Sequence, residues 1–329
     1  MLTYSIIVPV YRAVEVLPRC LAALIDQSVP CDDYEIIVVD DGSPDQTAEV
    51  AEKILEGSNG RVIRAAHGGP AHARNVGARA ARGEILAFTD ADCEPDHDWL
   101  ERLTAALQDE TVSGARGVYR TRQKSLVARF VQQEYQEKYD RLAHQATIDF
   151  VDTYSAAYRR DVFWSVNGFD STLIMNEDQE LSFRLATKGH RLIFVPQAVV
   201  YHQHVTSLWK YARRKYGIGY WKTLVLKQHP GKAVRDSHTP QIIKAQIGLL
   251  ASALLTTGAT VLDYDWALAA DIAWLLLLVS MLPLLSKIAQ RDPAVIPIAP
   301  LMIGARALSL GLGLLRGFQR VALHPRSSA

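Results

Sequence analysis

Short apolar runs rich in β-branched residues alternate with segments of helical periodicity along the first third of the chain. Each run ends at a polar or glycine-containing turn before the next helical segment begins. Strands that alternate with helices in this way indicate βαβ units and a parallel sheet. The predicted strands are residues 5–10, 35–39, 61–65 and 84–88, and the predicted helices are residues 14–27, 45–56, 71–81 and 98–108.

The alternation weakens after about residue 114, but helical and strand patterns continue to about residue 204. We expect these later elements to complete one α/β domain that covers residues 1–204. The predicted helices are residues 124–144 and 176–188, and the predicted strands are residues 152–159, 192–195 and 198–201.

The C-terminal part is apolar enough to enter a membrane. Residues 245–262 carry no formal charge, and residues 266–286 carry only Asp271. Both runs reach the length of roughly 20 residues that a membrane-spanning helix needs. Two buried core helices are the alternative. A third stretch, residues 298–320, contains Arg306 and is predicted to be an interfacial helix, with a third membrane span as the alternative.

The distribution of lysine and arginine predicts the orientation. Residues 205–244 form a basic and aromatic interfacial segment with nine Lys or Arg and one acid, and the gap between the two apolar runs has Asp263 and Asp265 but no base. Basic segments stay on the cytoplasmic side of a membrane. We therefore expect a membrane region at 245–329 in the cytoplasmic membrane, with the α/β domain on the cytoplasmic side. The first residues, MLTYSIIVPVYR, do not resemble a cleaved signal peptide.

Composition excludes several classes of protein. The chain has 329 residues, 36 Lys and Arg against 35 Asp and Glu, and a formal net charge of +1, which argues against a nucleic-acid partner. A hydrophobic content of 49% argues against disorder. Three cysteines exclude a disulfide scaffold and are expected to be free thiols.

Polar residues gather where three predicted strands end, and ligands of open α/β sheets bind at the carboxyl ends of strands. Asp90 and Asp92 follow the fourth strand. Two carboxylates at this spacing suit Mg²⁺ or Mn²⁺, which neutralises a diphosphate leaving group. The alternative is turn and capping chemistry, because Asp is common in such loops.

Three further patterns have both a chemical and a structural interpretation. Glu177 and Asp178 start a predicted helix, where an acid either acts as a general base or only complements the helix dipole. His202 follows a strand and is either a metal ligand or a strand-end residue. The turn at residues 67–70 (HGGP) leads into a helix whose N-terminus can face a phosphate. That turn matches neither a Walker loop nor the dinucleotide fingerprint.

Taken together and in order, these motifs resemble glycosyltransferase family 2, the inverting nucleotide-sugar transferases of GT-A fold. The resemblance covers roughly residues 3–205. The matching segments are residues 7–11 (IVPVY), 38–43 (VVDDGS), 73–77 (ARNVG), 88–92 (FTDAD), 159–160 (RR), 168–170 (GFD) and 177–185 (EDQELSFRL).

The resemblance implies a GT-A mixed sheet flanked by helices and a role for each matching residue. Asp178 resembles the catalytic base and is preceded by Glu177. Asp40 resembles a support of the turn before the second helix. The nucleotide- and donor-binding set is Pro9, Tyr11, Asp41, Arg74 and Asp90, and the metal-binding set is Asp92 and His202. The implied cofactor is a divalent cation, Mg²⁺ or Mn²⁺.

Two departures from the family pattern limit what the resemblance implies. Residues 155–156 are Ser-Ala where many members have Gly or Asn, which puts the acceptor side in doubt. The QxxRW motif of the processive synthases is missing from the segment around residues 213–221, which weakens a polysaccharide-synthase interpretation.

The expected function is a membrane-anchored inverting glycosyltransferase. It would move a sugar from a nucleotide-diphosphate donor, with UDP favoured and GDP possible, to a hydroxyl or phosphate of a lipid-linked or cell-envelope glycan acceptor. The basic segment suits an anionic inner leaflet. The alternatives are a nucleotide-sugar binding scaffold without transfer activity and a transferase that acts on a soluble acceptor. A sugar nucleotidyltransferase is disfavoured, because the loop after the first strand has no glycine.

Overall fold

The computed structural model describes residues 2–232 and 239–323, which form two compact units. The first unit contains residues 1–122 and 139–203, and the second contains residues 123–138 and 204–329. The predicted boundary after residue 204 lies one residue from the division between residues 203 and 204. The assignment of residues 123–138 to the C-terminal unit has no counterpart in the prediction. The chain passes from one unit to the other within helix α5 (Leu126–Leu142).

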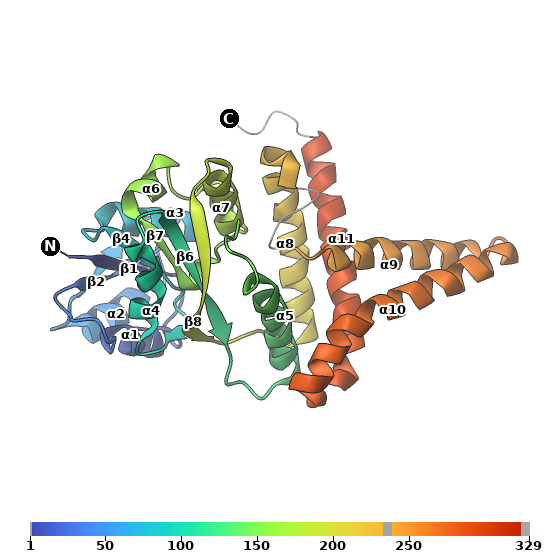
Figure 1. Ribbon diagram of the computed structural model, residues 1–329, viewed down its shortest axis with the longest axis horizontal. Helices are drawn as coiled ribbons and strands as arrows, with labels where there is room; N and C mark the ends of the chain where they lie inside the picture. The colour runs from blue at the N-terminus through green and yellow to red at the C-terminus, as the bar shows by residue number, and fades with distance from the viewer. Residues whose placement is uncertain (1, 233–238, 324–329) are drawn as a thin grey trace. The chain divides into compact units, whose positions relative to one another are not determined.

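The first unit is built on an eight-stranded mixed sheet with the strand order β3-β2-β1-β4-β7-β6-β8-β5 (Figure 1). Strands β1 to β4 are parallel, and β7 joins β4 and β6 in antiparallel orientation. The strands are β1 (Tyr4–Val10), β2 (Tyr34–Asp40), β3 (Gly60–Arg64), β4 (Ile85–Phe88), β5 (Cys93–Pro95), β6 (Val112–Arg120), β7 (Ala156–Arg159) and β8 (Arg191–His202).

Helices cover both faces of this sheet, as Figure 1 shows. One face carries α3 (Pro70–Ala80), α6 (Arg160–Ser165) and α7 (Glu177–Thr187), whose apolar side chains share one core with the sheet. The other face carries α1 (Leu17–Ile25), α2 (Thr47–Leu55) and α4 (Trp99–Ala105), and α4 is followed by the short helix η1 (Ala106–Gln108). The predicted α/β architecture with a mixed sheet between helices is confirmed.

The centre of the sheet determines where a ligand can bind. Strand β1 lies between β2 and β4, so the strand order changes direction there. In register, Val10 pairs with Asp40 and Ile7 pairs with Phe88, which aligns the carboxyl ends of the three strands. A crevice outside such a switch point is where open α/β sheets bind ligands.

One glycine allows α3 to lie close to this part of the sheet. A Cβ on Gly77 would be 2.5 Å from Cγ2 of Ile7 and 3.0 Å from Cγ2 of Val39. Both distances are shorter than van der Waals contact, so a larger residue would push the helix away from β1 and β2.

The prediction of two strands at 192–195 and 198–201 is wrong, because β8 is one continuous strand. Pro196 lies between the two predicted strands. In the structure the pairing with β6 jumps from Phe194 to Val199, and this bulge accommodates a residue that has no N–H to donate.

Strand β6 was not predicted at all. Its sequence, VSGARGVYR, contains two glycines and two arginines, and every residue except the last is buried. A strand buried on both faces does not alternate between apolar and polar residues, so it lacks the pattern that sequence analysis detects. The predicted strand at 152–159 is shorter in the structure, where the helix η2 (Thr153–Ser155) precedes β7.

The second unit is helical. Helix α8 (Leu208–Gln228) is followed by the short helix η3 (Pro230–Lys232), and it lies alongside α11 (Ala299–Leu323) (Figure 1). Helices α9 (Gln241–Ala259) and α10 (Ala267–Arg291) form a hairpin through η4 (Tyr264–Trp266), and η5 (Pro293–Ile298) leads into α11.

Glycines permit the close approach of α8 and α11. A Cβ on Gly219 would lie 2.5 Å from the carbonyl oxygen of Leu310, and one on Gly313 would lie 2.2 Å from that of Tyr216. Small residues that let two backbones meet in this way are typical of helix pairs in membranes.

Within the described residues of this unit, three helical segments are long and apolar enough to cross a membrane. They are Gln241–Ala259, Tyr264–Arg291 and Pro293–Leu323. The first two correspond to the predicted spans. The third includes the segment predicted to be interfacial, which therefore qualifies by length and composition as a third span.

The charge inside the third segment is compensated by partners. Arg306 is 4% exposed, and its guanidinium donates to Oε1 of Glu134 (2.7 Å) and to Oε1 of Gln246 (2.8 Å). Glu134 also accepts from the Tyr211 hydroxyl (2.9 Å), and Nζ of Lys215 lies 3.0 Å from its second oxygen. An arginine that is paired in this way is compatible with an apolar helix bundle.

Substitution of Glu134 by Ala is expected to destabilise the protein by about 3–5 kcal/mol, because it leaves the buried Arg306 and the half-buried Lys215 without their acid. The measurement is denaturant unfolding in detergent, with Glu137→Ala as the control. Glu137 lies on the same helix in a longer, less buried pair with Lys287 (3.8 Å), and its loss should cost about 1 kcal/mol or less. Equal losses of stability in the two variants would contradict this account.

Candidate active site

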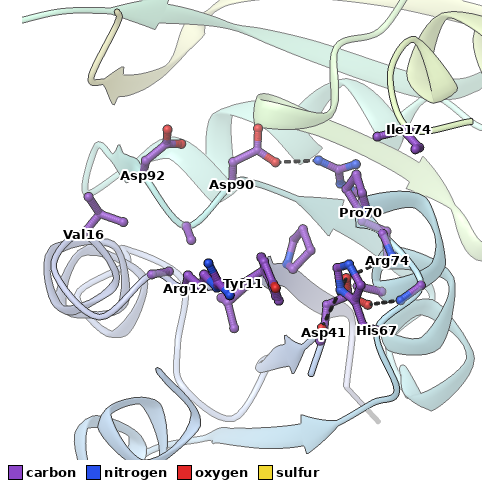
Figure 2. A pocket seen from close by; sticks show the side chains of 17 residues that line it. Tyr11, Arg12, Val16, Asp41, His67, Pro70, Arg74, Asp90, Asp92 and Ile174 are labelled. Atoms are coloured by element: carbon purple, nitrogen blue, oxygen red, sulfur yellow. Dashed lines mark hydrogen bonds and ion pairs between the residues drawn. The ribbon is translucent and has the colours of Figure 1, made fainter. Parts of the chain in front are cut away.

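A cavity of about 580 Å³ opens at the carboxyl ends of β1, β2 and β4 (Figure 2). Its size is within the usual range for a small-molecule or cofactor site, roughly 300–1,000 Å³. Residues that reach it come from strand ends, from the turn before α3 and from α3 itself. Of the predicted site residues, the lining includes Pro9, Tyr11, Asp41, Arg74, Asp90 and Asp92.

One wall of the cavity is aromatic. The ring of Tyr11 stacks on that of His67, with centroids 4.6 Å apart and planes 30° apart. Tyr11 is 42% exposed, and the guanidinium carbon of Arg12 lies 5.3 Å from the centroid of its ring. Such a wall suits a nucleobase.

Asp41 closes the floor of this region by binding the loop that precedes α3. Its two carboxylate oxygens accept from the backbone N–H groups of Gly68 (2.8 Å) and Gly69 (2.9 Å). Nδ1 of His67 is 2.8 Å from Oδ2 of the same carboxylate, as Figure 2 shows. The N–H groups that the sequence suggested for a phosphate therefore bind Asp41 in this structure.

Backbone conformation explains the glycines of both loops. Gly42 has a φ of +69° and Gly69 a φ of +87°, a region that L-residues rarely adopt. Next to Gly42, Oδ2 of the buried Asp40 accepts from the N–H of Ser43 (3.2 Å). The N–H of Arg12 donates to Oγ of the same serine (3.0 Å). These bonds hold the turn after β2 beside the end of β1.

Arg74 connects the cavity to α7. Its guanidinium donates to Oδ1 of Asp90 and to Oε1 of Glu177, both at 2.6 Å, and the residue is 4% exposed. Burial alone would lower the pKa of Arg74, but the two carboxylates raise it, so the side chain stays charged. The two bonds bring together Asp90, which is 16 positions from Arg74 in the sequence, and Glu177, which is 103 positions away.

The loop before α7 is held by the neighbouring residue of α3. The side-chain amide of Asn75 donates to the carbonyl of Phe169 (2.8 Å) and accepts from its N–H (3.0 Å). Gly168 has a φ of +64°, and a Cβ there would lie 2.6 Å from Oδ1 of Asn75. The matching segments 73–77 and 168–170 therefore pack against each other.

Asp178 lies in the first turn of α7, next to Glu177. Burial and, to a smaller extent, the charges of Glu177 and Asp152 together raise the pKa of Asp178 to about 8, against the opposing effect of Arg74. Burial also raises the pKa of Glu177, against the effect of Arg74. A carboxylate whose pKa lies near neutrality is well suited to general base catalysis.

The opposite side of the site has the chemistry of a cation-binding centre. Ligand atoms of Asp90, Asp92 and Cys93 lie within 4.8 Å of one another. Cys93 pairs with His202 across β5 and β8, which brings Nε2 of His202 to 3.1 Å from Oδ2 of Asp92. Burial raises the pKa of the Cys93 thiol well above its ordinary value, so this sulfur stays protonated. The carboxylates of Asp90 and Asp92 remain, and they are the oxygen ligands that Mg²⁺ or Mn²⁺ prefers.

The cavity also has residues that sequence analysis did not assign to the site. Val16 and Ile174 line it, and Ile174 is 62% exposed. Apolar side chains carry no chemical pattern, so no signal pointed to them. His67 belonged to a recognised turn, but its stacking on Tyr11 depends on contacts between separate loops.

Comparison with known proteins agrees with this geometry. Residues 5–166 match the family model of glycosyl transferase family 2. The glycosyltransferase AglE of Haloferax volcanii is 32% identical over 212 residues, which is 60% of this chain and 66% of that protein. The pre-mycofactocin glycosyltransferase of Mycobacterium tuberculosis is 33% identical over 205 residues, or 60% of this chain and 43% of the relative.

Solved structures share the fold. A mannosyltransferase from Pyrobaculum calidifontis in complex with GDP-Man and Mn²⁺ aligns with a TM-score of 0.63 and 22% identity, over 96% of this chain and 86% of that one. TarS 1–349 of S. aureus in complex with UDP aligns with a TM-score of 0.51 and 19% identity, over 98% and 92%. The chain spans less than two thirds of the length of the curated relatives, and the structural likeness shows the GT-A fold. Through residues 5–166, the chain belongs to glycosyl transferase family 2.

Proposed function

We propose that the protein is a membrane-anchored inverting glycosyltransferase that uses a nucleotide-diphosphate sugar and a lipid-linked acceptor. The observation that carries this proposal is the buried Arg74, which binds Asp90 of the cavity and Glu177 beside Asp178. A donor in the cavity and a base at the start of α7 then belong to one site. The family match supports the transfer of a sugar.

In the proposed reaction an acceptor hydroxyl gives its proton to Asp178 and attacks the anomeric carbon from the face opposite the diphosphate. The stereochemistry inverts, because the attack is a single displacement. Arg74 orients Asp90 toward the ribose or the sugar. Asp92 and His202 would hold a divalent cation, which supplies positive charge to the leaving diphosphate when bound. Such electrostatic stabilisation is often the largest contribution to catalysis.

The aromatic wall supports a nucleoside site at the end of the cavity that Tyr11 and His67 line. Tyr11 supports the base, next to Pro9 and Asp41. We propose a UDP-sugar as the donor, with a GDP-sugar as the alternative. The structural neighbours support both, since one is a complex with UDP and another is a complex with GDP-Man.

The helical unit supports the proposed location and acceptor. Three of its segments have the length and composition of membrane spans. The basic helix α8 suits an anionic leaflet, at about 1 kcal/mol for each base near the surface. An enzyme anchored in this way meets acceptors that are themselves held in the membrane, such as a polyprenyl phosphate or a growing glycolipid.

Asp178→Asn is expected to lower turnover by about 10²–10⁴-fold and to leave nucleotide affinity unchanged, because the amide cannot accept the proton. Transfer from UDP- and GDP-sugars to a membrane lipid extract, with Mg²⁺ or Mn²⁺ present, is followed by mass spectrometry, and nucleotide binding is measured by calorimetry. Asp161→Asn, an exposed acid of α6, serves as the control. Equal turnover in wild type and Asp178→Asn would exclude Asp178 as the base.

Asp92→Ala is expected to weaken metal-dependent nucleotide binding about tenfold or more, because it removes a carboxylate from the cation site. Chelation of the metal with EDTA should weaken binding to wild type in the same way and have little further effect on the variant. Glu94→Gln is the matched control, since Glu94 lies two residues away and pairs with Arg19 and Arg122 instead. Unchanged nucleotide affinity of Asp92→Ala in Mg²⁺ or Mn²⁺ would refute the role.

Cys31 offers a test of orientation, because it is exposed whereas Cys20 and Cys93 are buried. A membrane-impermeant maleimide should label the protein in lysed cells and leave it unlabelled in intact spheroplasts. Cys31→Ser should abolish the labelling and thereby identify the site. Labelling of Cys31 in intact spheroplasts would place this unit outside the cytoplasm and overturn the proposed location.

A further inference from the structure

Arg116 is a fully buried cation in β6 that the proposed mechanism does not use. The residue is 0% exposed, and its guanidinium donates to the Tyr154 hydroxyl (3.1 Å) and pairs with the carboxylate of Asp152. It also lies over the rings of Phe150 (5.4 Å), Tyr139 (5.7 Å) and Tyr154 (6.0 Å). Burial of an ion pair costs several kcal/mol for each ion before attraction offsets it, so such a pair is weak evidence of a role in stability.

The acidic partner of this pair lies beside the proposed base. Oγ of Ser182 donates to the carbonyl of Asp178 (2.7 Å) and accepts from the N–H of Val151 (3.0 Å). The segment that carries Asp152 is thereby fastened to the first turn of α7. The charge of Asp152 contributes to the raised pKa of Asp178.

Among the described residues, Glu177, Asp152, Arg74 and Tyr158 are ionisable groups that interact electrostatically with Asp178, from its own helix and from other elements. Glu177 precedes it in α7, Asp152 comes from the segment before η2, and Arg74 comes from α3. Tyr158 of β7 is the fourth, and its hydroxyl has a raised pKa because it is buried and lies near Asp178. Of these four groups, Asp152 forms an ion pair with Arg116, a buried cation that does not line the cavity.

Arg116 is also connected to the proposed metal side through stacked rings. Tyr154 stacks on Tyr119, with centroids 3.3 Å apart, and Tyr119 stacks on His202, with centroids 4.4 Å apart. The hydroxyl of Tyr139 bonds to that of Tyr154 (2.8 Å) and accepts from the N–H of Tyr119 (2.7 Å). Contacts of the Arg116–Asp152 pair therefore lead both to Asp178, the proposed base, and to His202 of the proposed metal-binding set.

We propose that Arg116 and Asp152 are a positioning pair for the base: the carboxylate of Asp152 lies on the side of α7 that carries Asp178, and Arg116 holds that carboxylate in place through their ion pair. The pair touches no substrate and acts through Asp178, so the inference rests on the proposed function. The two charges should therefore have opposite effects on the proton affinity of Asp178. Loss of Asp152 lowers the proton affinity of Asp178, and loss of Arg116 raises it.

The test is a direct titration of Asp178 by ¹³C NMR on the full chain in detergent, with carboxyl-labelled aspartate. The Asp178 signal is identified by its disappearance in Asp178→Asn. In Asp152→Asn the titration midpoint is expected to fall by about one pH unit, because loss of a neighbouring like charge lowers the pKa of a carboxyl group. In Arg116→Met the midpoint should rise.

Two controls separate charge from packing. Tyr154→Phe removes a hydrogen bond of Arg116 but no charge, and it should leave the midpoint unchanged. Glu35→Gln removes another buried carboxylate, which is bonded to Ser5 and Arg82, and it should also leave the midpoint unchanged. If Asp152→Asn does not fold, the double variant Arg116→Met with Asp152→Asn replaces it, and its midpoint should fall by less than one pH unit.

The proposal is overturned if folded Asp152→Asn, or the double variant in its place, titrates at Asp178 as wild type does. It is also overturned if Tyr154→Phe shifts the midpoint as much as the charge variants. Because the titration needs no turnover, a shifted midpoint in a protein that shows no transfer would support the pair and reject the proposed function. Where transfer is measured, the ascending limb of kcat/KM against pH should move with the midpoint.

Discussion

The buried guanidinium of Arg74 is the constraint on which the site depends. A cation at 4% exposure is stable only if acids surround it, and the two that do so come from the end of β4 and from the start of α7. Removal of either acid would leave the buried guanidinium with a single carboxylate partner and with an N–H group that has lost its acceptor. The loop before α7 is fixed in turn by Asn75, the next residue of α3. One turn of a helix thus determines where the strand end and the distant acids meet.

The features that sequence analysis identified are those with local causes. Strands β1 to β4 have apolar runs ended by turns, and Asp41, Asp90 and Asp92 follow such runs directly, so their convergence at one edge of a parallel sheet could be predicted. The order of motifs added the family and the GT-A fold. The apolar helices were evident because roughly 20 uncharged residues in sequence are rare in other contexts.

The remaining features depend on contacts between distant residues. Strand β6 has no alternation because both of its faces are buried, and β8 continues past Pro196 only because a bulge accommodates it. Arg306 argues against a membrane helix in the sequence alone, because its partners Glu134 and Gln246 are distant in the sequence. Arg116 and Asp152 belong to no motif, and nothing in the spacing of residues 116 and 152 indicates that they pair. Such partners are set by tertiary packing.

The binding of Asp41 to the N–H groups of Gly68 and Gly69 has a consequence for the energetics of recognition. The carboxylate of Asp41 satisfies backbone N–H groups that could otherwise bind an anion. The loop is therefore folded without a bound ligand. A receptor that is shaped in advance loses little conformational entropy on association, and more of the contact energy then appears as affinity. Under the proposed function, the same preformed loop would bind a donor without a folding step that slows association.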